Sequence, residues 1–261
     1  MNTPLDDSMH PQIRNLNRFY HQTDLGRYVQ GVLLNHIRNF WPDIRGRTIL
    51  GYGYACPLDS WLADSYRTVY LMPDSQGAEP WIGKRGNVVV ESSDAHWPLP
   101  TSSLELCVIL HGLETCSHAS TLLSECWRTL APEGVVLVIV PNRAGFWARR
   151  DSTPFGFGRP YSSSQIESLM QECRLEPISR AAALFGPPGP RATVGRMAPT
   201  IDRVARHMPI GYAAGIHLLM ARKRVFSTHR SGIGETVKSK LASLQGHGIA
   251  EPGPASGRSR S

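Results

Sequence analysis

The sequence predicts an α/β fold in which a mostly parallel β-sheet is covered by helices on both faces. Apolar runs of five to seven residues recur along the chain, and segments with helical periodicity lie between them. Runs that are apolar at nearly every position indicate strands buried on both faces, as in a parallel sheet. The alternation of the two kinds of segment is typical of doubly wound proteins.

The elements of the first half follow from periodicity. Leu16–Trp41 is predicted to be one helix, because its apolar residues recur at three- and four-residue steps. Apolar runs bounded by turn residues predict three strands, with a short helix after the first, in the order Thr48–Tyr52, helix Leu58–Tyr66, Thr68–Met72 and Asn87–Glu91. Pro73 is expected to stop the second strand.

The second half continues the alternation. Strands Leu104–Leu110 and Gly134–Val140 flank a predicted helix, Ser117–Leu130, which gathers its apolar residues on one face. A helix at Ser162–Cys173 opens on serines that can cap it. Two final strands lie on either side of an insertion rich in Pro, Gly and Arg: Arg180–Phe185 and Gly215–Arg222. We expect the last of these strands to run antiparallel to its neighbours.

Composition excludes several classes of protein. A chain of 261 residues with 41% apolar content can build a substantial core. It contains no apolar run of about 18 residues, so a transmembrane helix is not expected. The polar, acidic N-terminal stretch lacks the pattern of a signal peptide. Five scattered cysteines without a Cys-x-x-Cys pair predict reduced thiols in a cytoplasmic protein, with neither disulfides nor a metal site.

The net charge of +7 is concentrated near the C-terminus. From Arg222 onward there are eight basic and two acidic residues, which leaves 20 basic and 19 acidic residues before it. The sequence therefore predicts an N-terminal helical segment (1–45), a sheet domain (46–226) and a disordered basic tail (227–261). That tail is expected either to be solvated or to contact RNA, an anionic surface or a protein partner.

The turn after the first strand suggests a nucleotide site. The stretch Ile49–Pro57 reads ILGYGYACP, in which Gly51, Gly53 and Ala55 alternate with larger residues. Small residues at this spacing allow a sharp turn and a close approach to a bound nucleotide, with free N–H groups at a helix start. Ordinary strand-to-helix turns use the same spacing, so both interpretations stay open.

The order and spacing of the strands resemble a class I S-adenosylmethionine-dependent methyltransferase of the type 11 kind. The resemblance covers roughly Ile37–Arg224 and is strongest over Pro98–Asn142. That block contains a His-x-Leu-Glu-like segment, His111–Glu114, and family-like residues farther along: Glu125, Arg128, Leu130, Pro132 and Gly134. The resemblance implies a Rossmann-like, mostly parallel seven-stranded sheet. Glu125 and Arg128 are expected to form an (i, i+3) pair on a helix surface.

The resemblance also implies a cofactor, S-adenosylmethionine, and a set of residues that contact it. These residues are Gly51, Tyr52, Gly53, Ala55, Met72, Asp94, Ala95 and His111. Gly51 stands where the family has an acid that helps to hold the methionine ammonium. Met72 stands where an acid accepts both ribose hydroxyls, with Asp74 two residues later. Asp94 keeps the polar residue near the adenine.

Two functions fit these features. One is an S-adenosylmethionine-dependent methyltransferase with an unknown acceptor; because the sulfonium is already activated, no catalytic residue follows from the sequence. The other is a catalytically inactive methyltransferase-like protein that binds a partner. The segment Asn142–Tyr161 either shapes an acceptor pocket, with arginines for an anionic group, or forms a hydrophobic lid. His111 follows a strand as either a loop contact or a functional group, and Cys56 is expected to be a small filler.

Overall fold

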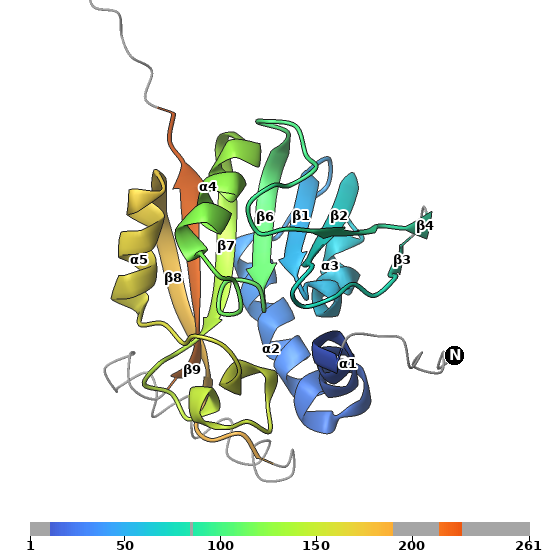
Figure 1. Ribbon diagram of the computed structural model, residues 1–261, viewed down its shortest axis with the longest axis vertical. Coiled ribbons are helices and arrows are strands. Elements are labelled where there is room, and N and C mark those ends of the chain that lie inside the picture. The colour runs from blue at the N-terminus through green and yellow to red at the C-terminus, as the bar shows by residue number, and fades with distance from the viewer. Residues whose placement is uncertain (1–10, 84–85, 190–213, 226–261) are drawn as a thin grey trace, which may run out of the picture. The chain divides into compact units, whose positions relative to one another are not determined.

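The computed structural model describes residues 11–83, 86–189 and 214–225 (Figure 1). A seven-stranded sheet crosses them, built from β1 (Thr48–Gly53), β2 (Arg67–Pro73), β5 (Val89–Ser92), β6 (Leu104–Leu110), β7 (Leu130–Pro141), β8 (Leu175–Phe185) and β9 (Ala214–Lys223). The strand order is β5-β2-β1-β6-β7-β9-β8. A separate ribbon pairs β3 (Ile82–Gly83) with β4 (Gly86–Asn87).

The sheet has the predicted topology. Strands β5, β2, β1, β6 and β7 pair in parallel, whereas β9 is antiparallel to both β7 and β8. The predicted neighbours are confirmed in register, with Val108 of β6 opposite Leu137 of β7. The chain moves outward from β1 in one direction to β2 and β5, and in the other to β6 and β7. The resulting switch point between β1 and β6 is where such sheets bind ligands, outside the carboxyl ends of the strands.

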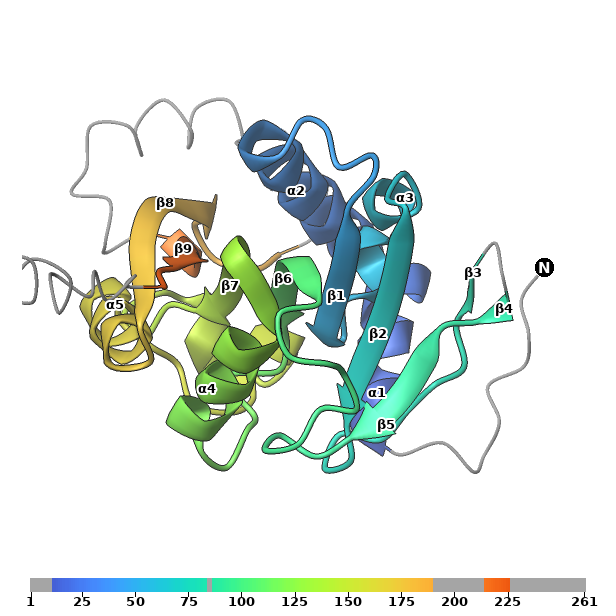
Figure 2. The same ribbon diagram turned by 90° about the horizontal axis from the view of Figure 1, so that it is seen from above.

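Helices cover both faces, as the sequence predicts (Figure 2). They are α1 (Pro11–Asn17), α2 (Asp24–Phe40), α3 (Asp59–Leu62), α4 (Ala119–Thr129) and α5 (Ser163–Glu172). Val29 and Leu33 of α2 join one apolar core with Ile49 of β1. Leu122 of α4 and Ile166 of α5 belong to the core on the opposite face. Alternate residues of each buried strand therefore feed two separate cores.

The prediction of one helix over Leu16–Trp41 was wrong. The chain forms α1, then a π-helical turn η1 (Arg18–Gln22), and after a break at Thr23 it forms α2. Thr23 is extended, and its hydroxyl accepts from the backbone N–H of Gly26 (2.9 Å) and donates to the carbonyl of Phe19 (2.6 Å). A threonine that caps a helix start satisfies an otherwise unpaired N–H, which separates two helices that share one apolar periodicity. The break places α1 and η1 beside the carboxyl ends of the strands (Figure 1).

Smaller boundary corrections follow from pairing. β7 begins at Leu130 rather than Gly134, because Leu130 pairs with Leu104 of β6. β8 begins at Leu175 rather than Arg180, because its first residues pair with the end of β9, Leu175 with Lys223. The helix at α5 starts as predicted, with a reciprocal capping box between Ser162 and Gln165. The predicted tail and most of the insertion before β9 lie outside the described residues. Within residues 11–83, 86–189 and 214–225, no helix is long and apolar enough to cross a membrane.

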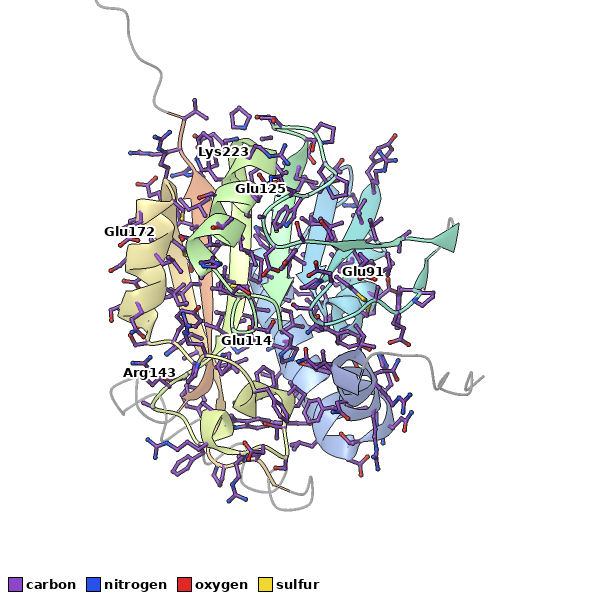
Figure 3. All side chains as sticks on the ribbon, viewed as in Figure 1. Glu91, Glu114, Glu125, Arg143, Glu172 and Lys223 are labelled. Carbon is purple, nitrogen blue, oxygen red and sulfur yellow. The ribbon has the colours of Figure 1, made fainter. Side chains whose placement is uncertain are left out.

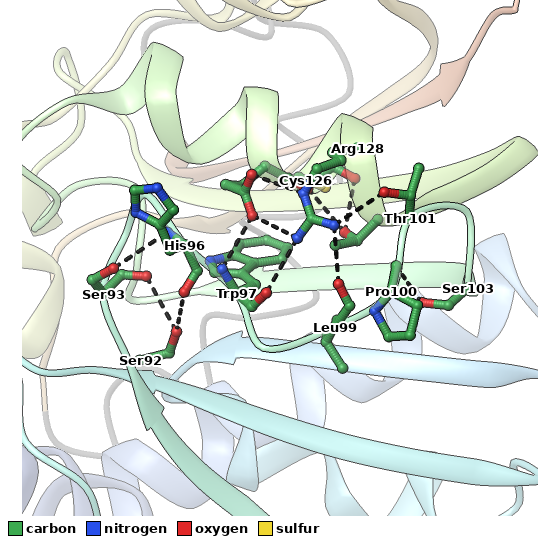
Figure 4. A network of polar contacts seen from close by, with 12 residues as sticks. Ser92, Ser93, His96, Trp97, Leu99, Pro100, Thr101, Ser103, Cys126 and Arg128 are labelled. Carbon is green, nitrogen blue, oxygen red and sulfur yellow. Dashed lines mark hydrogen bonds and ion pairs between the residues drawn. The ribbon is translucent and has the colours of Figure 1, made fainter.

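Arg128 of α4 ties the loop before β6 to the helix (Figure 4). Its guanidinium donates to both carboxylate oxygens of Glu125 (2.9 and 2.8 Å), which confirms the predicted (i, i+3) contact. It also donates to the carbonyls of Trp97 (3.1 Å) and Leu99 (3.0 Å) and to the hydroxyl of Thr101 (3.2 Å). Glu125 in turn accepts from the backbone N–H of Trp97 (3.1 Å). The pair therefore fixes the entry to β6 as well as the helix surface.

We expect Arg128→Met to destabilise the fold by about 2 kcal/mol, because it removes charge-assisted hydrogen bonds to the carbonyls of Trp97 and Leu99. The measurement is urea denaturation followed by far-UV circular dichroism. Arg180→Met is the control: Arg180 is 72% exposed in its pair with Glu167, and its loss should cost about 0.5 kcal/mol or less. Equal effects of the two substitutions would contradict a bracing role for Arg128.

The same network predicts a pH dependence. The hydrogen bond from Arg128 lowers the pKa of Glu125 below its usual value. A carboxyl with a lowered pKa in the folded state contributes stability above its unfolded pKa, about 4.3, and loses it as the pH falls through the folded value. The stability difference between wild type and Glu125→Gln should thus be larger at pH 7 than at pH 3. A difference that does not change between these two pH values would refute the coupling.

Candidate functional site

A cavity of about 630 Å³ lies outside the carboxyl ends of the central strands. Its walls come from α1 and η1, from the segment after β6, and from residues 151–158, with Gln76 beyond β2 adding a further side chain. The residues that line it are Gln12, Asn15, Leu16, Arg18, Phe19, Thr23, Gln76, His111, Glu114, Thr115, Asp151, Ser152, Pro154, Phe157 and Gly158. The volume is within the range of small-molecule sites, and the position is the sheet's switch point.

A chain of buried hydrogen bonds ends at this cavity. The hydroxyl of Tyr20, from η1, lies 2.7 Å from Nε2 of His111, and Nδ1 of His111 lies 3.1 Å from Oε1 of Glu114. The three side chains are at most 3% exposed. Burial, with the Glu114 carboxylate adding to it, raises the pKa of Tyr20 well above its usual value, so the phenol stays protonated. Tyr20 then donates to Nε2, and Nδ1–H donates to Glu114.

The backbone of His111 is held in an uncommon conformation. Its φ of 54° lies in the left-handed region, which costs energy for a residue with a side chain. The carbonyl of His111 accepts from Nε2 of Gln76 (3.0 Å), and its ring lies 4.7 Å from that of Phe155. His111 is therefore fixed at the end of β6 by contacts to its carbonyl, to both ring nitrogens and to its ring.

Two acceptor atoms beside His111 have no hydrogen-bond partner. They are Oε2 of Glu114 and Oε1 of Gln76, and both are buried in residues that line the cavity. Figure 3 shows Glu114 beyond the carboxyl ends of the central strands. A buried acceptor without a partner costs about 1–3 kcal/mol, and more for a charged group. Such a pair of oxygens is complementary to a ligand that brings hydrogen-bond donors.

The predicted glycine turn packs against the protein itself. Gly53 has a φ of 78°, and a Cβ there would lie 2.3 Å from the carbonyl oxygen of Leu110. A Cβ on Gly51 would lie 2.7 Å from that of Ala55 and 3.0 Å from the ring of Tyr70. The small residues thus allow β1 and β6 to approach closely. Gly51, Gly53 and Ala55 are buried and do not line the cavity.

The predicted adenine and ribose residues also lie outside the cavity. Tyr52 stacks on Trp97 with ring centroids 4.9 Å apart, and its hydroxyl donates to Asp94 (2.5 Å). Asp94 and Ala95 are half-buried. Met72 is buried, and its sulfur accepts from the backbone N–H of Glu79 (3.4 Å).

Asp74, the acid two residues after Met72, is exposed, and its side chain accepts from the backbone N–H of Ser75 (2.7 Å). Gln76 points inward in its place. Of the eight residues predicted to contact a cofactor, His111 is therefore the one that lines the cavity.

Sequence reasoning missed Tyr20, Gln76 and Glu114. Glu114 carries a signal, since it follows His111 by three residues just beyond a buried strand, within the segment that resembles the family. Tyr20 gave no signal, because its position in an apolar periodicity is that of an ordinary core residue. Gln76 lies in a polar turn whose neighbour, Asp74, looked chemically stronger.

The segment Asn142–Tyr161 packs apolar side chains into the core and also contributes to the cavity. Trp147 and Phe155 are buried and pack edge to face, with centroids 5.8 Å apart, as a hydrophobic lid does. Gly158, with a φ of 81°, lets the same segment approach Glu114, whose carbonyl accepts from the N–H of Arg159 (2.7 Å). The segment also contributes a wall of the cavity. Its arginines, Arg143, Arg149, Arg150 and Arg159, are exposed and do not line that wall.

Comparisons with known proteins agree with this architecture. Residues 50–138 match the family described as "Methyltransferase domain". A probable S-adenosylmethionine-dependent methyltransferase of Mycolicibacterium smegmatis is 33% identical over 84 residues, which are 31% of this chain and 32% of that protein. One of Mycobacterium tuberculosis is 27% identical over 101 residues, covering 38% and 36% of the two chains. The match spans about a third of the length of these curated relatives.

Solved structures share the fold over most of the chain. A Thermotoga maritima S-adenosylmethionine-dependent methyltransferase, described as a possible histamine N-methyltransferase, aligns with a TM-score of 0.59 and 17% identity, over 81% of this chain and 97% of that one. One from Archaeoglobus fulgidus aligns with a TM-score of 0.55 and 12% identity, over 82% and 100%. The match over residues 50–138 and this shared topology make the chain similar to the class I S-adenosylmethionine-dependent methyltransferases, whose fold it has.

Proposed function

We propose that the protein transfers a methyl group from S-adenosylmethionine to a small acceptor in the cavity beside His111. The observation that carries this proposal is the pair of buried, unpartnered oxygens, on Glu114 and Gln76, at the switch point of a methyltransferase sheet. The cofactor brings the matching donors, an ammonium group and two ribose hydroxyls. This part of the site therefore fits the cofactor.

The glycine turn fits less well. Contacts from Gly51, Gly53 and Ala55 would need the turn to open, since all three are buried against neighbouring groups. Tyr52, Met72, Asp94 and Ala95 are likewise engaged within the protein or away from the cavity. We therefore assign the first contacts to His111, Glu114 and Gln76, and keep the turn residues as contacts of a more open state.

The work of the protein would be positioning. When bound, the cofactor supplies a methyl group that is already activated, so orientation and exclusion of water account for much of the rate. The lid residues Trp147 and Phe155 provide an apolar cover, and the chain from Tyr20 to Glu114 fixes the carboxylate. Glu114 can also hold the proton that an acceptor releases, if the acceptor must be deprotonated.

The cysteines and one solved structure bear on location and partners. All five cysteines are free thiols, which agrees with a reducing compartment, and we propose a cytoplasmic location. A Haloferax volcanii methyltransferase with a similar fold, at a TM-score of 0.54 and 12% identity, was solved in complex with the Trm112 activator. A protein partner for this chain, and RNA or anionic-surface contact through its basic tail, stay predictions.

The proposal predicts that S-adenosylmethionine and S-adenosylhomocysteine bind in calorimetry. We expect weaker binding than in a protein with both family acids, by roughly one to two decades for each missing charge-assisted hydrogen bond. Absence of binding at millimolar ligand would refute the enzyme proposal and favour the inactive, partner-binding alternative.

A blocking variant locates the binding site. Gly53→Val is unsuitable, because a Cβ there would strike the carbonyl of Leu110 and disturb the sheet. Ser152 is exposed at the cavity wall, so Ser152→Trp should weaken binding at least tenfold without unfolding the chain. Ser164→Trp, on the exposed surface of α5, is the matched control and should bind like wild type. Equal binding by both variants would place the ligand elsewhere.

A further inference from the structure

We propose that the lid segment, Asn142–Tyr161, docks onto an anionic membrane surface. The proposal concerns an outer surface of the protein and not the chemistry of the cavity, so it does not rest on the proposed function. A bilayer rich in anionic phospholipid presents negative charge at its surface and apolar chains beneath it. The lid segment matches both layers with exposed phenylalanines and unpaired arginines.

The lid segment has a buried side and an exposed side. Figure 1 shows it in yellow-green, as a loop beyond the carboxyl ends of β6 and β7. Trp147, Thr153 and Phe155 are buried and hold one side of the loop against the core. Residues 149–152 and 157–159 are exposed. Their side chains therefore face solvent at this end of the molecule.

Two phenylalanines of the lid segment are half exposed. The exposed fractions are 51% for Phe146 and 52% for Phe157, whereas their aromatic neighbours Trp147 and Phe155 are buried. A phenylalanine in water gains free energy when its ring enters the boundary between headgroups and acyl chains. Phe146 does not line the cavity. Insertion into a bilayer requires no groove around such a ring, whereas base stacking in a single-stranded nucleic-acid site uses one.

The arginines of the lid segment are exposed and have no carboxylate partner in the part of the chain that the structure describes. They are Arg143, Arg149, Arg150 and Arg159. Exposed arginines elsewhere do pair with carboxylates: Arg27 with Asp24, Arg45 with Asp43 and Arg180 with Glu167. A guanidinium that no carboxylate holds can donate to the phosphate of a lipid headgroup.

The charge of the chain is uneven in the same way. The lid segment and residues 11–23, which share the walls of the cavity, contain six arginines and one acid, Asp151. Because 20 basic and 19 acidic residues precede Arg222, 14 basic and 18 acidic residues remain for the rest of that stretch. A basic face on an otherwise acidic body is attracted to an anionic surface and is oriented by it.

The test measures binding of the full-length protein to lipid vesicles. Flotation over a lipid titration gives the partition coefficient for phosphatidylcholine vesicles and for vesicles with about 30% phosphatidylglycerol, at about 0.1 M and about 0.5 M salt. The two lid variants are Arg149→Gln/Arg150→Gln and Phe146→Ser, all at exposed positions. The first should weaken binding to anionic vesicles about thirtyfold, at about fivefold per arginine. The second should weaken it about fivefold.

Matched controls lie at the opposite end of the sheet. They are Arg47→Gln/Arg67→Gln and Tyr66→Ser, at exposed residues beside the amino ends of β1 and β2. Both controls should bind within about twofold of wild type, because these residues point away from the docked face. Higher salt should shrink the effect of the Arg149→Gln/Arg150→Gln pair and preserve that of Phe146→Ser, since salt screens charge and not apolar burial.

Each outcome decides the proposal. Binding that needs phosphatidylglycerol and falls in both lid variants, but in neither control, supports it. Wild type that does not bind anionic vesicles overturns it. Lid variants that bind like wild type also overturn it and assign the binding to another part of the chain, such as the basic tail that every variant keeps. A loss with the arginine pair alone overturns insertion of the lid.

A second ligand separates a membrane from a nucleic acid. The same variants are titrated with a fluorescent single-stranded RNA. RNA binding that depends on Arg149 and Arg150, without vesicle binding, overturns the membrane and makes RNA the occupant. Far-UV circular dichroism checks each variant for folding. If the first arginine pair does not fold, Arg143→Gln/Arg159→Gln is judged by the same criteria, with the same loss expected.

Discussion

The buried hydrogen bonds of His111 are the constraint on which the site depends. They join three parts of the chain that the sheet alone would leave separate: η1 through Tyr20, the end of β6 through His111 itself, and the turn after β2 through Gln76. Each bond satisfies a polar group that would be costly to bury alone. Tyr20 lies just before the helix break at Thr23, so the break, the left-handed backbone of His111 and the cavity meet at one place.

The spacing of small residues in the glycine turn is compatible with two structural roles. Gly53 and Gly51 have the spacing of a nucleotide turn, and the same absence of side chains lets β1 approach Leu110 and Tyr70. In a family member with an acid in the turn, the charge faces the ligand from β1. In this protein the turn carries no charge, and the buried polar groups near the switch point are Glu114, beside β6, and Gln76, beyond β2.

The lid and the loop before β6 show two ways of fixing irregular backbone. In the lid, Trp147 and Phe155 pack into the core, and the ring of Phe155 lies against that of His111. In the loop, Arg128 donates to carbonyls that have no strand partner, with Glu125 holding the guanidinium in place. Apolar packing therefore fixes the backbone at the carboxyl end of the sheet. A charged network fixes the loop that leads into β6 at the opposite end.

The sequence by itself determined the sheet. Apolar runs such as Leu104–Leu110 can be satisfied only when both faces are covered, and their alternation with helices leaves few topologies. The sequence did not determine which polar groups meet. Tyr20 and His111 are separated by 91 residues and Gln76 and His111 by 35, so only tertiary packing brings them together. Periodicity indicates which residues are buried, and it predicted Tyr20 as a core residue and Leu16–Trp41 as one helix. It does not identify the hydrogen-bond partner of a buried hydroxyl or the side chain that caps a helix. Those depend on which residues become neighbours in the folded chain.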